Sequence, residues 1–271
     1  MSSDLHGQMA ALAKRLSREA CALAKSPVGN QKISRKMDKS VVTETDRAIE
    51  AHILRTIAEH YPDHAVCAEE SAGRSAMDRT KARYCWVIDP LDGTRNFVSG
   101  FPCFSTSIAV LDRGQPVVGV VLEHNLGSLY AATLGGGATL NDRPMHAGQA
   151  QPGFDLLVGV PSSKDPLTVS VLRRWLDAKG LVHRNLGSTA LHLGMVAAGT
   201  LSAAFCKRCK IWDIAAGALL VTEAGGFISD PFGQPRVPFD LVGDPTDDLP
   251  ILSAWPGVHQ QLLDSIEGIG G

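Results

Sequence analysis

The chain lacks any surplus of positive charge. Its 271 residues contain 26 Lys and Arg against 28 Asp and Glu, which gives a formal net charge of −2 at pH 7. Proteins that hold nucleic acid or an anionic membrane surface usually carry a basic excess. We therefore expect neither nucleic acid nor a membrane among the partners of this protein.

Long apolar runs are also missing. No stretch approaches the roughly 20 apolar residues of a membrane-spanning helix. Residues 1–8 are polar and lack the apolar core of a signal peptide. We therefore expect a cytoplasmic protein. With 44% hydrophobic residues, the chain is long enough to bury a large core in one or two domains.

The six cysteines do not form a complete metal-binding pattern. Cys206 and Cys209 make a single C-x-x-C motif, and the sequence has no second C-x-x-C pair. A zinc site would need two more ligands. A thioredoxin-like role would need the motif at a helix start in a small βαβ unit. We interpret the spacing as a coincidence and leave a redox role open, since cytoplasmic cysteines are mostly reduced thiols.

Hydrophobic periodicity predicts mixed α and β structure in two lobes, residues 1–147 and 148–271. A helix is expected to begin at a cap residue, Thr43 or Thr45, and to end near Tyr61. In the helix over 167–179, Trp175 and Leu176 are expected to face the core. The other expected helices cover 4–25, 190–198 and the apolar stretch after Trp212, and the expected strands cover 64–68, 84–88, 104–112, 116–123, 129–133, 155–160, 182–185 and 202–206. Short strands and a terminal helix are expected in residues 227–271.

The most informative stretch begins with the apolar run Tyr84–Ile88 and continues through two acids, Asp89 and Asp92, into Gly93-Thr94. Carboxylates at a strand end can hold hard divalent cations. The free N–H groups of residues 93–95, at the start of a helix, can accept a phosphate. An acidic turn would explain Asp-Gly alone, but not the longer string.

Three further acids stand at the ends of predicted elements. Glu69 follows a short strand, Asp46 lies in a first helical turn, and Asp213 begins an apolar, alanine-rich helix. Each also has an ordinary explanation. Glu69 and Glu70 could be solvent-exposed surface acids, Asp46 could interact favourably with the dipole of its helix, and Asp213 could be an N-cap.

Taken together, these strings resemble the inositol monophosphatase family of Mg²⁺-dependent phosphatases, in order and spacing over nearly the whole chain. The matching strings are Val42-Thr43-x-x-Asp46, Ala68-Glu69-Glu70-Ser71, Asp89-Pro-x-Asp-Gly-Thr-x-Asn-Phe97, the Gly135–Asn141 hairpin and Trp212-Asp-x-Ala-Ala-Gly…Glu223-Ala-Gly-Gly226. The resemblance implies an α+β fold, the layered α/β/α/β/α sandwich shared with fructose-1,6-bisphosphatase.

The resemblance also implies a phosphoric monoester hydrolase that uses two to three Mg²⁺ ions. A dianionic phosphate would be repelled by bare carboxylates, so cations are needed between them. The implied metal ligands are Glu69, Asp89, the Leu91 carbonyl, Asp92 and Asp213. The implied substrate-binding residues are Asp92, Gly93, Thr94, Ser188, Cys206 and Asp213. Lys36 is implied to lie on a mobile loop beside the outermost metal.

The implied catalytic residues are Glu69, Thr94 and Asp46. Thr94 and Glu69 would orient a metal-activated water, and Asp46 would tune Thr94. The water would attack phosphorus directly, without a covalent enzyme intermediate. None of the nine histidines is assigned a role.

The choice of substrate depends on one departure from the family pattern. Inositol-specific members carry a glutamate seven residues before the Trp-Asp aspartate, where this chain has Cys206, and a thiol is a poor acceptor for a sugar hydroxyl. Lys207, Arg208 and Lys210 could serve a second phosphate or a carboxylate, or could be surface residues. Inositol 1-phosphate is our first expectation, with histidinol phosphate, a nucleotide 3′-phosphate, a sugar bisphosphate and NADP⁺ left open.

Another class of function stays open beside the enzyme. Some members of this superfamily serve as binding partners of the transcription machinery, with phosphatase activity secondary. The resemblance alone implies a homodimer and inhibition by lithium.

Overall fold

The computed structural model describes residues 2–25, 33–35, 41–71, 78–148 and 153–268. Lys36 lies outside these ranges. The described helices are α1 (Ser2–Lys25), α2 (Glu44–His60), α3 (Thr94–Ser99), α4 (Pro166–Asp177), α5 (Thr189–Ala197), α6 (Ile211–Glu223) and α7 (Val258–Ile266). Among them, none combines the length and apolarity that crossing a membrane requires.

The strands form two large sheets and one small one. The small sheet pairs β1 (Ile33–Arg35) with β2 (Val41–Thr43). The seven-stranded sheet runs in sequence order through β3 (Ala65–Ala68), β4 (Tyr84–Asp92), β5 (Ser105–Asp112), β6 (Gln115–Glu123), β7 (Leu129–Thr133), β8 (Gly137–Leu140) and β9 (Arg143–Met145). The five-stranded sheet has the order β11-β10-β12-β14-β13, formed by Leu181–Arg184, Leu156–Gly159, Ala203–Cys206, Ile251–Ala254 and Phe227–Ser229.

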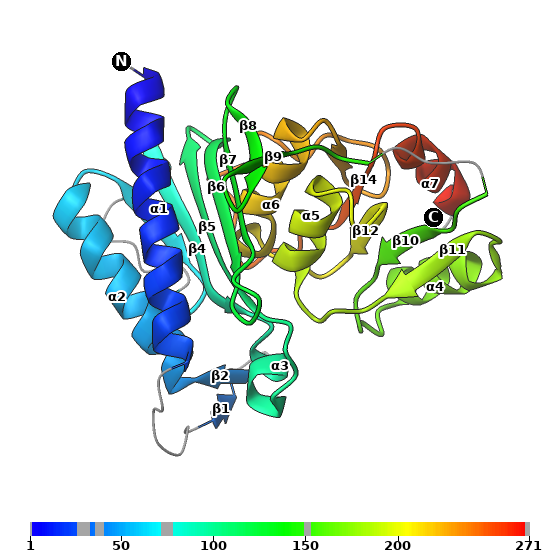
Figure 1. The fold of residues 1–271 in the computed structure, drawn as a ribbon, viewed down its shortest axis with the longest axis horizontal. Coiled ribbons are helices and arrows are strands. Elements are labelled where there is room, and N and C mark those ends of the chain that lie inside the picture. Colours follow the sequence, from blue (N-terminus) through cyan, green and yellow to red (C-terminus); the bar gives the residue numbers. More distant parts are fainter. Residues whose placement is uncertain (1, 26–32, 36–40, 72–77, 149–152, 269–271) are drawn as a thin grey trace.

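The sheets and helices stack in five layers (Figure 1). Helices α1 and α2 cover one face of the seven-stranded sheet, and α5 and α6 lie between this sheet and the five-stranded one. Helices α4 and α7 cover the far face of the smaller sheet. The expected α/β/α/β/α sandwich is therefore confirmed, and each of its interfaces is an apolar cluster.

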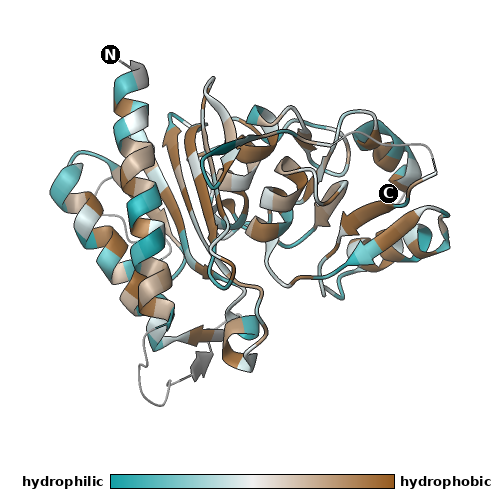
Figure 2. Cartoon of the chain, in the orientation of Figure 1, coloured by the Kyte–Doolittle hydropathy of each residue, from teal (hydrophilic) through white to brown (hydrophobic). Residues whose placement is uncertain are grey.

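The polarity of the elements explains this stacking. Figure 2 shows hydrophobic residues along the strands of the large sheet, while α1 and α2 alternate between hydrophobic and hydrophilic surface. Helix α6 is apolar on nearly every side, as befits a helix between two sheets. It lies very close to β6, where a Cβ on Gly119 would come within 2.6 Å of the Ala216 carbonyl oxygen.

The division into lobes at residue 147 stays a prediction. The larger sheet uses only the first half of the chain and the five-stranded sheet only the second. However, α6 from the second half packs directly on the first sheet. The two halves therefore share one core.

Most of the predicted helices and strands are found within a residue or two of their expected bounds. One prediction about the core is wrong: Trp175 is fully buried, but Leu176 is 69% exposed. Successive helical residues point about 100° apart, so α4 cannot turn both toward the same narrow interface. Strands β1, β2 and β9 were not expected, and each spans only three residues.

A bulge in β4 shapes the site. Asp89 pairs with Ser107 of β5 and Asp92 with Ser105, so two residues of β4 face one residue of β5. The first of the two, Pro90, has no N–H to give to the ladder. Its carbonyl instead accepts a hydrogen bond from Thr106 Oγ1 at 2.8 Å. In a regular strand, side chains three residues apart point to opposite faces. The bulge instead brings the carboxylates of Asp89 and Asp92 close together.

Candidate active site

Three acids from two distant segments meet at the end of β4. Oxygen atoms of Asp89, Asp92 and Asp213 all lie within 4.8 Å of one another. Asp89 is buried, and the other two are half-buried. Asp213 comes from the first turn of α6, which delivers it from the second half of the chain. The fold thus collects the acids that the motifs singled out.

The electrostatics of this cluster oppose its own ionisation. Burial, followed by repulsion from the neighbouring acids, raises the pKa of Asp89 and Asp213 well above the usual value for an aspartate. Burial also raises the pKa of Asp92, to about 6. Such a cluster is costly when charged and uncompensated, and divalent cations bound through carboxylate oxygens relieve that cost. The donor set is the hard, all-oxygen type that suits Mg²⁺.

Each acid of the cluster is oriented by a backbone N–H. Asp89 Oδ1 accepts from the Leu91 amide at 2.9 Å. Asp92 Oδ2 accepts from the Ala190 amide at 2.7 Å. Asp213 Oδ2 accepts from the Lys210 amide at 2.6 Å, in the capping box of α6. Asp213 is therefore the third residue of the helix and not its N-cap.

Glu69 stands beside the cluster. It follows β3, which runs parallel to β4, and its N–H donates to the Ile88 carbonyl at 3.1 Å. Its charge contributes to the raised pKa of Asp89, Asp92 and Asp213. Glu69 is thus positioned next to the three acids, from the edge strand of the sheet.

Thr94 and Asp46 form the other predicted pair. Thr94 Oγ1 lies 3.1 Å from Asp46 Oδ1 and 3.1 Å from the Leu91 carbonyl oxygen. Asp46 is buried, and burial raises its pKa. Its second oxygen accepts from the N–H of Thr43 at 2.9 Å and also from the Thr43 hydroxyl. Thr43, one of two candidates, is the N-cap of α2, and this capping box fixes the carboxylate that Thr94 contacts.

Gly93 is the N-cap of the short helix α3, in a left-handed conformation with φ of 96°. A Cβ at this position would lie 3.0 Å from the Cys103 carbonyl oxygen, so glycine is needed for two reasons. The turn places the Thr94 hydroxyl against Asp46. Phosphate binding by the amides of Gly93 and Thr94 stays a prediction.

Ser188 forms a direct hydrogen bond with Asp92. It is the N-cap of α5, where it accepts from the Leu191 amide at 3.2 Å, and its Oγ donates to Asp92 Oδ2 at 2.6 Å. Ser105 Oγ lies 3.2 Å away on its other side. A role for Ser188 in substrate binding stays a prediction, and the hydroxyl is engaged within the protein.

Cys206 ends β12 and is 5% exposed. Its sulfur accepts a hydrogen bond from Thr189 Oγ1 at 3.8 Å, next to the α5 residues that hold Asp92. The charge of Asp92 acts on the pKa of this thiol. Cys206 therefore borders the acidic cluster. This is where we expected it, because it occupies the sequence position of the family's substrate-binding glutamate.

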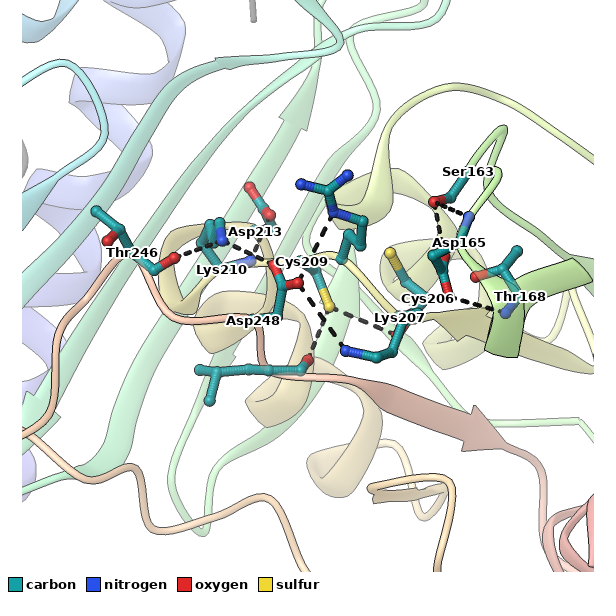
Figure 3. Close-up of polar contacts among 12 residues, drawn as sticks. Ser163, Asp165, Thr168, Cys206, Lys207, Cys209, Lys210, Asp213, Thr246 and Asp248 are labelled. Atoms are coloured by element: carbon teal, nitrogen blue, oxygen red, sulfur yellow. Dashed lines mark hydrogen bonds and ion pairs between the residues drawn. The ribbon is translucent and has the colours of Figure 1, made fainter. Parts of the chain in front are cut away.

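The three basic residues Lys207, Arg208 and Lys210 surround Asp248, and Figure 3 shows the two lysines beside it. Lys210 Nζ lies 2.7 Å from Asp248 Oδ1 and also donates to the Thr246 carbonyl. Lys207 and Arg208 approach the same carboxylate at 3.9 and 3.8 Å. Three cations thus share one acid, and Lys210 is the one most firmly held.

Sequence reasoning missed the donors that orient the cluster. They include the amides of Ala190 and Lys210, and Thr106, which holds the Pro90 carbonyl. An amide donor carries no residue-type signal, and no motif marks Thr106. Thr106 is also 2.9 Å from His124 Nε2, and burial lowers the pKa of His124 to about 4.

Fold and site together define a class of layered α/β protein in which acids gathered at the end of a sheet could hold a metal ion. A sequence model of the inositol monophosphatase family matches residues 6–267, and the chain belongs to that family. The family is metal-dependent, typically with Mg²⁺, and acts on small phosphorylated substrates. The protein is accordingly a phosphoric monoester hydrolase of the inositol monophosphatase type.

Similar proteins carry two kinds of name. The chain is 35% identical over 212 residues to Inositol-1-monophosphatase from Mesorhizobium japonicum, covering 76% of this chain and 78% of that protein. It is 39% identical over 201 residues to Nus factor SuhB from Pasteurella multocida, covering 72% and 73%. The crystal structure of the extragenic suppressor protein suhB from Bartonella henselae superimposes with a TM-score of 0.84 at 26% identity, covering 95% of this chain and 97% of that one.

Proposed function

We propose that this phosphatase uses two to three Mg²⁺ ions to hydrolyse a small phosphorylated metabolite, with inositol 1-phosphate as the first candidate. The observation that carries the proposal is the cluster of Asp89, Asp92 and Asp213 within 4.8 Å. Its raised pKa values fit a site built to hold cations between protein carboxylates and substrate phosphate.

The residues at the end of β4 would hold the ions. The proposed ligands are Glu69, Asp89, the Leu91 carbonyl oxygen, Asp92 and Asp213. When bound, Mg²⁺ offsets the charge of the acids and the phosphate and lowers the pKa of water. The hydrogen bonds from backbone amides keep each aspartate in one orientation, so little reorganisation is needed when the substrate arrives.

Thr94 would position the attacking water together with Glu69. The Thr94 hydroxyl gives its proton to Asp46 or to the Leu91 carbonyl, which leaves its oxygen lone pairs to accept from a water. A water held in this way turns its own lone pair toward phosphorus. The amides of Gly93 and Thr94 would bind phosphate oxygens, and the attack would be direct.

Inositol 1-phosphate leads because of the family and because a relative at 35% identity is named Inositol-1-monophosphatase. Cys206 favours other substrates, because its sulfur is a weak hydrogen-bond acceptor that already contacts Thr189. Histidinol phosphate, a bisphosphate nucleotide, a sugar bisphosphate and NADP⁺ therefore remain candidates.

Phosphate release in the presence of Mg²⁺ tests the substrate. The panel holds inositol 1-phosphate, histidinol phosphate, adenosine 3′,5′-bisphosphate, fructose 1,6-bisphosphate and NADP⁺, and a chelator-treated sample serves as the blank. We expect inositol 1-phosphate to give the highest kcat/KM. A clear lead for another compound would reject inositol 1-phosphate and keep the phosphatase.

A second role deserves a test because a relative at 39% identity is named Nus factor SuhB. In this alternative the protein binds the transcription machinery, and its phosphatase activity is secondary. Replacement of the chromosomal gene by the Asp92→Asn variant separates the two roles. The enzyme role predicts the phenotype of a deletion, and the binding role predicts a normal cell.

We further propose a homodimer and inhibition by lithium, both from the family alone. Light scattering at several protein concentrations tests the dimer. Undiminished phosphate release in high millimolar Li⁺ would count against the proposed small, hard oxygen site.

A further inference from the structure

The two cysteines of the C-x-x-C motif lie on one turn beside the acidic cluster. Cys206 ends β12, and Cys209 lies two residues before α6 begins. The Cys209 sulfur comes back to within 3.8 Å of the Cys206 carbonyl oxygen. Figure 3 shows Cys209 next to Asp248 and Cys206 close by, among the residues that contact this carboxylate.

The two thiols differ in reactivity. Hydrogen bonding lowers the pKa of Cys206, and burial raises the pKa of Cys209 well above its usual value. Burial likewise raises the pKa of Cys67 to about 11 and of Cys85 to about 12. Cys206 is also 5% exposed, whereas Cys209 is 0% exposed, so Cys206 is the one of the pair that an oxidant reaches first.

We propose that Cys206 and Cys209 are a thiol redox pair, which a hydroperoxide converts reversibly to a disulfide at the wall of the active site. The Cys206 sulfur attacks one peroxide oxygen, the O–O bond breaks, and the other oxygen leaves as water after taking up a proton. Cys206 is then a sulfenic acid. The Cys209 sulfur attacks it, the S–O bond breaks, and a second water leaves. Two thiols lose two electrons, and one hydrogen peroxide becomes two waters.

The disulfide would alter the segment that holds Asp213. In the reduced protein the Cys209 thiol donates to the Leu249 carbonyl at 2.9 Å, and the Leu249 amide donates to the Cys209 carbonyl at 2.8 Å. Bonding to Cys206 takes the sulfur away from Leu249. The next residue, Lys210, gives Asp213 its amide hydrogen bond at 2.6 Å. A shift of residues 209–210 therefore disturbs one acid of the cluster.

Mapping the cysteines tests the chemistry without any variant. The full-length protein, loaded with Mg²⁺, is treated with hydrogen peroxide, alkylated and digested for mass spectrometry. We expect a peptide linked between Cys206 and Cys209, which dithiothreitol restores to two thiols. Alkylated Cys206 and Cys209 beside an oxidised Cys21 or Cys103, which are partly exposed, would overturn the proposal.

The Cys209→Ser variant tests the order of the steps. It lacks the second sulfur, so oxidation should stop at a Cys206 sulfenic acid that dimedone traps. Absence of the dimedone adduct at Cys206 in the folded variant would overturn the assignment of Cys206 as the attacking thiol.

The effect on activity rests on the proposed function. We expect phosphate release to fall about tenfold on disulfide formation, the usual consequence of losing a hydrogen bond to a charged group, and to return with dithiothreitol. Unchanged activity of the disulfide form would overturn the coupling to Asp213. A reduced protein without phosphatase activity would instead reject the proposed function, and the mapped disulfide would still decide about the thiol pair.

Discussion

Asp92 and Ser188 bring the two halves of the chain together at the acidic cluster. They are 96 residues apart in sequence, and Ser188 Oγ donates to Asp92 Oδ2 at 2.6 Å. The Ala190 amide, also from α5, donates to the same oxygen at 2.7 Å. The docking of α5 against the seven-stranded sheet thus sets the direction of a proposed metal ligand.

The Ser188→Ala variant should weaken this arrangement. We expect kcat/KM to fall about tenfold, because a hydrogen bond to a charged group is lost. The Mg²⁺ concentration that gives half-maximal activity should rise. Loss of the N-cap should also lower the free energy of unfolding by about 1 kcal/mol. Steady-state kinetics over a range of Mg²⁺ concentrations give the first result, and chemical denaturation gives the second.

Two control variants isolate the contact with Asp92. Ser188→Thr keeps the hydroxyl and should retain most of the activity. Ser105→Ala removes the hydroxyl that lies 3.2 Å from Ser188 Oγ and that, among the described residues, makes no hydrogen bond to the Asp92 carboxylate. A greater loss for Ser105→Ala than for Ser188→Ala would contradict the assigned role.

The Thr94→Val variant should lose turnover more than substrate binding. Valine has the same shape but can neither donate to Asp46 nor accept from a water. We expect kcat to fall about a hundredfold or more with little change in KM, the usual range for losing a group that positions a proton transfer. Thr94→Ser, which keeps the hydroxyl, should recover much of the rate. Equal activities of the valine and serine variants would remove Thr94 from the mechanism.

Stabilisation by Mg²⁺ should increase with pH. Asp92 has a folded pKa of about 6 against the ordinary 3.8, and burial and repulsion also raise those of Asp89 and Asp213. In the metal-free protein these groups bind more protons folded than unfolded, so their contribution to stability is present at low pH and declines as pH rises through the folded pKa. Cations favour the ionised acids and reverse that decline.

Thermal unfolding with and without MgCl₂ measures this linkage. The rise in Tm caused by Mg²⁺ should be small at about pH 5 and large at about pH 8. Asp92→Asn removes one titrating ligand and should reduce the rise at the higher pH. A rise that is equal at both pH values would show that the acids are not the groups to which Mg²⁺ binding is linked.

Lys210 should act through stability and not through substrate choice. Its ammonium group is held by Asp248 at 2.7 Å and by the Thr246 carbonyl. We expect Lys210→Met to lower the free energy of unfolding by about 1 kcal/mol and to leave the order of substrates unchanged. Lys207→Met, whose nitrogen is 3.9 Å from Asp248, is the matched control and should cost less stability. A changed substrate order in Lys210→Met would make Lys210 a specificity residue.

The acids of the cluster could be predicted from the sequence, but the hydrogen-bond donors that orient them could not. Asp89 and Asp213 belong to strings in which residue type and spacing are both restricted, so their meeting could be predicted. The amides of Ala190 and Lys210 could not, because every residue except proline has one. The pairing of Cys209 with Leu249 and the shared contacts of Asp248 depend on loops that only the fold brings together. Helical spacing could not decide between Trp175 and Leu176, because both neighbours are apolar and only one fits the interface.

The central claim is that the acids at the end of β4 hydrolyse a phosphate monoester with Mg²⁺. The most direct test compares phosphate release by the natural protein and by Asp92→Asn, on the best substrate of the panel and at saturating Mg²⁺. We predict that the variant folds and loses at least about a thousandfold in kcat/KM, since it lacks one charge and one ligand of the metal centre. Equal activity of the folded variant, or no Mg²⁺-dependent phosphate release by the natural protein, would contradict the account.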